Sequence, residues 1–112
     1  MISTNPQENV EEYAAAALKL YLHLPETPLK ASSNDRQTAA NLHDRGIRLE
    51  IIESALLLAS IRRLSRLPEL PRLLPIRSLA YFLPVIEEIL ANPVPNDYLG
   101  YLRKKVESLK NR

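Results

Sequence analysis

Few side chains in this chain of 112 residues have the spacing that acid–base or metal chemistry requires. The two histidines, His23 and His43, lie on different predicted segments, and neither has a second histidine at helical spacing. A zinc site of the His-Glu-x-x-His type needs that spacing, so the sequence predicts none. We interpret each histidine as a surface or helix-capping residue.

Carboxylates occur in pairs at Glu11/Glu12, Glu50/Glu53 and Glu87/Glu88. Glu50 and Glu53 would share a helix face, but di-metal bundles also need Glu-x-x-His pairs, which the chain lacks. Without cysteine there is no disulfide, thiol catalyst or thiolate ligand, and two glycines are too few for a phosphate-binding loop. We therefore predict a protein without enzymatic activity, catalytic residues, metal or cofactor. An enzyme would require the fold to bring distant histidines or carboxylates together.

Basic residues offer a different chemistry because they are concentrated in the second half of the chain. The formal net charge is +2, yet residues 1–56 carry −3 and residues 57–112 carry +5. Ten of the fifteen basic residues are arginines, whose planar guanidinium binds phosphate or carboxylate with two hydrogen bonds. The alternative is a solvated basic face. The predicted phosphate contacts are Arg62, Arg63, Arg66, Arg72, Arg77, Arg103, Lys104 and Lys105.

Tyrosines accompany these basic residues. Tyr81, Tyr98 and Tyr101 could stack on exposed bases while arginines bind the phosphates. In the alternative interpretation, Phe82 and the tyrosines fill the core. Tyr98 and Tyr101 are three residues apart, so both could face inward with their hydroxyl groups at the rim.

The positions of these residues depend on helices that caps and breakers delimit. The first helix is predicted to begin at Asn5, with Pro6 in its first turn and Glu8 completing a capping box, and to end before Pro25 and Pro28. The second begins after Ser32, with Asp35 three residues later, and ends near Arg45 because Gly46 suits a left-handed terminator.

Three further helices are predicted. Residues 49–65 are apolar around most of the helix, which is typical of a central helix. Pro68, Pro71 and Pro75 make the next connector stiff. A helix over 77–91 contains Pro84, which should kink it or shorten its first half, and a last helix opens at Asn96. The expected fold is a compact all-α orthogonal bundle of about five helices, one domain over 1–112 with mobile ends at 1–5 and 110–112.

Residues 32–90 resemble the helical C-terminal domain of DnaD-like replication proteins. The resemblance lies in a short capped helix ending at Gly46, the sequence Ile47-Arg48-Leu49-Glu50-Ile51-Ile52-Glu53-Ser54-Ala55, and a serine-aromatic helix from Ser78. In that helix Tyr81, Val85 and Ile89 follow the family's spacing, with Ile89 where the family has tryptophan. The resemblance implies that this helix and the following tail bind DNA.

These observations favour an accessory module of a bacterial replication or mobile-element nucleoprotein complex. It would bind nucleic acid, DNA rather than RNA, through the arginine-rich second half. The rival hypothesis is a protein-interaction adaptor or small structural subunit that uses charge complementarity and the Leu/Pro-rich connector 64–75, with a homo-oligomer as one form.

Two observations separate these hypotheses. Convergence of the predicted arginines on one face favours nucleic acid, whereas their pairing with Glu50, Glu53, Glu87 or Glu88 favours the adaptor. Exposed connector leucines, including Leu70 and Leu73, would mark a docking patch. We expect them instead to fold back and seal the core between the third and fourth helices.

No uncharged apolar run of membrane-spanning length and no basic-then-apolar leader occurs in the sequence. We therefore expect no membrane partner and a cytoplasmic location.

Overall fold

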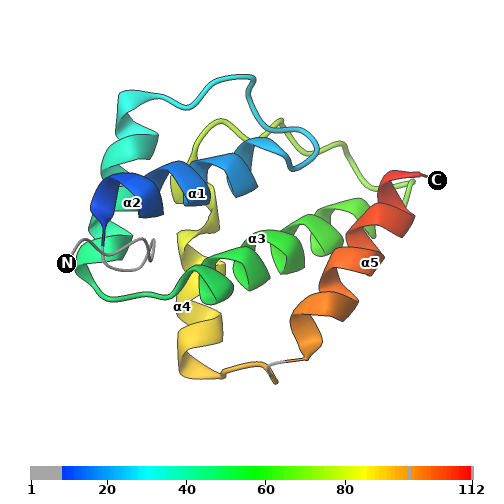
Figure 1. The fold of residues 1–112 in the computed structure, drawn as a ribbon. Coiled ribbons are helices and arrows are strands. Elements are labelled where there is room, and N and C mark those ends of the chain that lie inside the picture. Colours follow the sequence, from blue (N-terminus) through cyan, green and yellow to red (C-terminus); the bar gives the residue numbers. More distant parts are fainter. Residues whose placement is uncertain (1–8, 96, 112) are drawn as a thin grey trace.

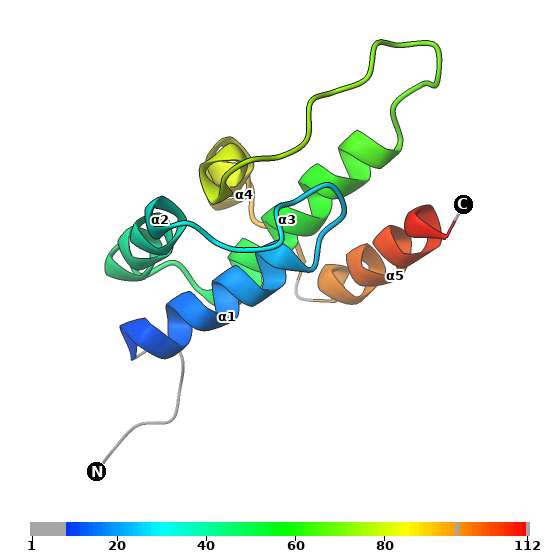
Figure 2. The ribbon, with the colours of Figure 1, turned by 90° about the horizontal axis from the view of Figure 1, so that it is seen from above.

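Five α-helices and one 3₁₀ helix, without strands, make up the part of the chain that the computed structural model describes, residues 9–95 and 97–111 (Figure 1). The all-α prediction is confirmed. Helix α3, Leu49–Leu64, is the central helix and packs against α1, α4 and α5. Figures 1 and 2 show α1, α3 and α5 running in similar directions, with α2 and α4 crossing them. The remaining elements are α1 (Val10–Leu22), α2 (Ser33–Asp44), η1 (Leu79–Phe82), α4 (Leu83–Ala91) and α5 (Tyr98–Lys110).

Helix α2 begins and ends at the residues that the sequence predicts. The Ser32 side chain accepts from the Asp35 amide, and Asp35 accepts from the Ser32 amide, which completes a capping box. At the other end, Gly46 has φ +72°, and the amides of Gly46 and Ile47 donate to the carbonyls of His43 and Leu42. This bonding is a Schellman motif, which requires the left-handed conformation that glycine adopts without strain.

Asp35 also joins α2 to a distant part of the chain. Its side chain is buried, and Oδ1 accepts from the backbone amide of Leu79 at 2.9 Å. One carboxylate therefore binds amides at the starts of two helices that are 44 residues apart. The capping pattern predicted the first of these bonds, whereas the second arises only from the tertiary fold.

Three predicted helix starts differ from the structure. Helix α1 begins at Val10, where the Asn9 side chain accepts from the amides of Glu11 and Glu12. Helix α4 begins at Leu83, so Pro84 lies in its first turn, where the missing N–H costs no helical bond, and η1 replaces the predicted first half. Helix α5 has Asp97 as its N-cap. The predicted starting residues Asn5 and Asn96 lie outside the described residues, as do Pro6 and Glu8.

The core lies around α3 and is closed by aromatic side chains from α1 and η1. Tyr13, Tyr21 and Phe82 are fully buried, and Tyr21 meets Phe82 edge to face with ring centroids 6.0 Å apart. The Tyr13 hydroxyl donates to the Ile47 carbonyl at 2.6 Å. Burial raises the pKa of both Tyr13 and Tyr21 to about 12. The core is therefore continuous from α1 to η1.

In the described part of the chain, every helix is too short or too polar to cross a bilayer. Lys110, which the sequence places in a mobile end, is the last residue of α5.

Candidate interaction surface

Two of the predicted phosphate-binding arginines are paired with carboxylates. Arg62 on α3 forms two hydrogen bonds with Glu88 on α4, at 2.9 and 2.6 Å. Arg103 on α5 binds Glu53 on α3 in the same two-pronged way, at 2.7 and 2.8 Å. The hydrogen bonds from Arg62 hold the pKa of Glu88 below its usual range, so the pair is charged at neutral pH. We therefore remove Arg62 and Arg103 from the predicted phosphate contacts.

Arg63 is also withdrawn from the predicted contacts because its side chain is only 7% exposed. Its guanidinium donates to the Tyr81 hydroxyl, the Glu26 carboxylate and the Leu74 carbonyl, at 3.1, 3.2 and 2.9 Å. It also lies over the Tyr81 ring, with Cζ 5.5 Å from the centroid. Arg63 is thus a structural residue that connects α3 to two connectors and to η1.

Five predicted cations remain accessible after these corrections. All five are exposed and make no ion pair within residues 9–95 and 97–111, although Arg66 donates one hydrogen bond to the Pro71 carbonyl at 3.0 Å. The predicted surface is therefore reduced to one group on the segment between α3 and η1 and another on α5: Arg66, Arg72 and Arg77, with Lys104 and Lys105.

The tyrosines divide between the two interpretations. Phe82 lies in the core, as the packing interpretation expects. Tyr98 and Tyr101 stack on each other with centroids 5.3 Å apart and planes 18° apart. Tyr98 packs partly against the core, but Tyr101 is 54% exposed, so an inward orientation of both rings is wrong. Tyr81 is partly exposed and holds Arg63.

The segment of residues 65–78, called the connector segment from here on, projects beyond the end of α3 (Figure 2). Its prolines cannot donate backbone hydrogen bonds, and Pro68 begins a turn in which the Leu70 amide donates to the Leu67 carbonyl. The segment is fixed at its base, where the buried Ile76 donates its amide to the Glu26 carbonyl at 2.9 Å.

Four leucines of the connector segment are exposed. Leu67 and Leu74 are 61% and 78% exposed, and the exposure of Leu70 and Leu73 is 40% or more. The expectation that these leucines seal the core between α3 and α4 is wrong. Because Pro68, Pro71 and Pro75 prevent regular structure, the segment extends outward and does not return its side chains to the core.

The leucines of this region surround a concavity, called the connector cavity. Its volume is about 540 Å³, which is within the range of ligand pockets. Leu64, Leu67, Leu70 and Leu73, at three-residue intervals, line it together with Pro68 and Pro71. Arg66 and Arg72 add unpaired positive charge, and Arg63 and Glu26 contribute a neutral ion pair. The surface is therefore both apolar and cationic.

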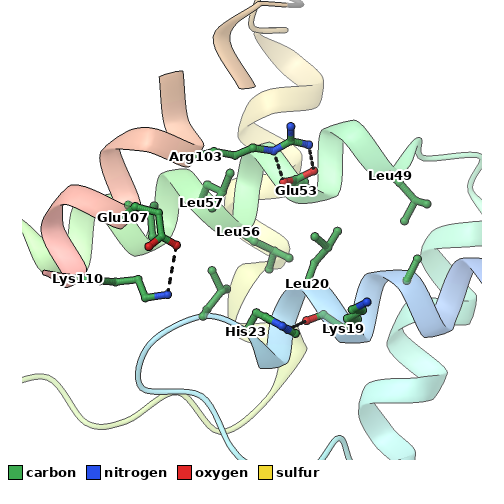
Figure 3. Close-up of a pocket in the computed structure, with 13 residues that line it drawn as sticks. Lys19, Leu20, His23, Leu49, Glu53, Leu56, Leu57, Arg103, Glu107 and Lys110 are labelled. Atoms are coloured by element: carbon green, nitrogen blue, oxygen red, sulfur yellow. Dashed lines mark hydrogen bonds and ion pairs between the residues drawn. The ribbon is translucent and has the colours of Figure 1, made fainter. Parts of the chain in front are cut away.

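A second concavity, of about 610 Å³, lies over α3 between α1 and α5 (Figure 3). Leucines such as Leu20 and Leu56 form its apolar surface, whereas its charged groups are largely paired. Figure 3 shows the Glu53–Arg103 and Glu107–Lys110 pairs along α5. Sequence reasoning missed this groove because it depends on the spacing of α1 and α5, and no periodicity encodes that spacing.

Within the described ranges, no three His, Asp or Glu side chains gather in a way that could hold a metal ion. No protein-family model, curated protein or solved structure matches the chain. The resemblance to DnaD-like proteins stays a prediction.

Proposed function

We propose that this chain is a protein-interaction module that docks a partner through the connector segment. The observation that carries the proposal is the exposure of Leu67, Leu70, Leu73 and Leu74 on one projecting segment. Clustered exposed apolar side chains mark interaction sites in soluble proteins. Docking covers these leucines without rearranging the helical body, because the prolines and the bonds at Glu26 already hold the segment in place.

The pairing of the arginines also supports this proposal over nucleic acid. Arg62 and Arg103, expected to bind phosphate, are matched to Glu88 and Glu53, the arrangement that the adaptor hypothesis anticipates. A phosphate backbone would have to compete with carboxylates already in two-pronged geometry. A protein partner, in contrast, uses the connector leucines and leaves these pairs intact.

Site-specific photo-crosslinking tests this function in the organism that makes the protein. A photoreactive phenylalanine analogue replaces Leu70, and the same analogue at exposed Gln37 on α2 serves as the matched control. We expect a discrete protein adduct from position 70 that is absent from position 37 and is lost when Leu67→Ser and Leu74→Ser are added. Identical adducts from both positions, or none from position 70, contradict the proposal.

Binding of single-stranded nucleic acid is the second candidate, and the surface of α5 favours it. The exposed Tyr101 ring, stacked on Tyr98, is followed on the next turn by unpaired Lys104 and Lys105. An aromatic ring beside cations is the arrangement that stacks a base and neutralises its phosphate. On this candidate function, the tyrosine pair is the stacking site and the lysines are the phosphate contacts.

Fluorescence anisotropy with labelled single-stranded DNA tests the second candidate. Tyr101→Ala should weaken binding about tenfold, since stacking on one ring is worth roughly 1–3 kcal/mol. Lys104→Gln with Lys105→Gln should lower the salt dependence by about two counterions. Lys30→Gln, an exposed lysine on the other side of α1, is the charge control. Equal affinity of the wild type and these variants would sink this candidate.

A further inference from the structure

The connector cavity indicates what kind of partner it accepts. Leu64, Leu67, Leu70 and Leu73 present an apolar lining at three-residue intervals, so a partner must supply apolar side chains to cover it. The cavity is formed by one short segment and the end of α3, which suits an inserted peptide segment better than a flat protein surface.

Charge around the cavity restricts the partner further. Arg66 and Arg72 line it and make no ion pair in the described part of the chain. Arg63, the third arginine, is matched by Glu26, and the exposed Glu69 lies at the turn outside the lining. The uncompensated charge at the cavity is therefore positive and belongs to two arginines, each able to bind a carboxylate through two hydrogen bonds.

Resting on the proposed docking function, we infer that the connector cavity receives an acidic peptide segment of a partner protein, with apolar side chains placed between carboxylates. The apolar side chains enter among the leucines, and the carboxylates pair with Arg66 and Arg72. The apolar contacts supply most of the affinity, and the ion pairs at the rim select acidic over basic segments and accelerate association.

The competing occupants fit less well. Phosphates of a nucleic acid could pair with Arg66 and Arg72, but the ribose-phosphate backbone would leave the leucines uncovered. A second copy of this chain would bring the same arginines into contact with one another in a symmetric arrangement, where like charges repel.

A pair of short fluorescein-labelled peptides tests the inference against the full chain by anisotropy. One peptide carries two leucines flanked by glutamates, and in the other lysines replace the glutamates. We expect saturable binding of the acidic peptide and at least about tenfold weaker binding of the basic one, because the charge difference acts at two arginines. Raising the salt concentration should weaken the acidic complex.

Matched variants assign the binding to the cavity. Leu67→Ser with Leu70→Ser should weaken acidic-peptide binding about tenfold, and Arg66→Gln with Arg72→Gln should reduce both the affinity and its salt dependence. Leu29→Ser removes a leucine that is 98% exposed outside the cavity, and Lys30→Gln removes a charge there, so both should bind like the wild type. Circular dichroism confirms that each variant is folded.

Equal binding of the acidic and basic peptides overturns the inference, as does wild-type affinity in the Leu67→Ser, Leu70→Ser variant. Displacement of the peptide by single-stranded DNA with no effect of the leucine changes identifies a nucleic-acid surface instead. A position-70 protein adduct together with no acidic-peptide binding overturns only the partner chemistry and leaves the docking function standing. Absence of that adduct contradicts the docking function itself.

Discussion

The helical body and the connector segment treat the same residue types in opposite ways. In the body, leucines such as Leu56 are buried, and Arg62 and Arg103 each meet a carboxylate in two-pronged geometry. In the connector segment, leucines are exposed, and Arg66 and Arg72 make no ion pair with a described residue. Composition alone does not distinguish the two regions. The difference comes from the prolines, which keep residues 65–78 out of the helical packing.

The largest difference should appear when a leucine is truncated in each region. Leu56→Ala leaves a cavity in the core and should lower the free energy of unfolding by about 3 kcal/mol. Leu67→Ala should change it by less than about 0.5 kcal/mol, since the side chain is already mostly solvated. Denaturant unfolding of both variants measures the contrast. A comparable loss in both would place the connector segment in the core.

Removal of the Asp35 carboxylate tests whether the body depends on its buried polar bond. Asp35→Ala leaves the amides of Ser32 and Leu79 without their partner and should lower the free energy of unfolding by roughly 2 kcal/mol. Asp35→Asn, which keeps an acceptor oxygen, should fall in between. Asp97→Ala is the control because the Asp97 side chain makes no capping bond. Thermal melts that give Asp35→Ala and Asp97→Ala the same stability contradict the structural role of Asp35.

Two neighbouring arginines sharpen the comparison at the junction of the regions. Arg63→Met removes three hydrogen bonds from a buried guanidinium and should destabilise the protein by roughly 1.5 kcal/mol. It should also make the connector segment more sensitive to trypsin. Arg62→Met breaks an exposed pair and should cost only about 0.5 kcal/mol. Equal proteolysis of the two variants would falsify the idea that Arg63 holds the connector segment.

The smallest effect concerns pH. Hydrogen bonds from Arg45 and Arg62 lower the pKa of Glu87 and of Glu88. A lowered folded-state pKa stabilises the fold above the ordinary carboxylate range, and this stability is lost as the pH falls through the lowered pKa. The melting temperature of wild type should therefore drop more steeply toward acid pH than that of Glu87→Gln, Glu88→Gln. Glu69→Gln, on the connector segment, should retain the wild-type slope.

The sequence predicts the fold best where local chemistry decides the structure. The capping box at Ser32, the left-handed Gly46 and the apolar circumference of α3 depend on neighbouring residues, and all three are confirmed. The start of α4 illustrates the limit, because Pro84 allowed either a kink or a shorter helix and only the fold selects the second.

The candidate site was less predictable because it depends on contacts between distant residues. Arg62 and Glu88 are 26 residues apart, and Arg103 and Glu53 are 50 apart, so a count of arginines overstates the accessible charge. Exposure of the connector leucines is likewise invisible to composition. The signal that could have indicated it is the combination of three prolines with leucine, since those prolines prevent the segment from joining a helix.

Glu26 has an evolutionary consequence that its contacts alone do not convey. It is held at φ +66°, a backbone conformation that favours glycine, while its carbonyl accepts from Ile76 and its carboxylate binds Arg63. Glycine would relieve the strain and lose the carboxylate, whereas most other residues would keep the strain and lose the bond. Few substitutions are therefore neutral at position 26, and a change there should be accompanied by a compensating change at position 63.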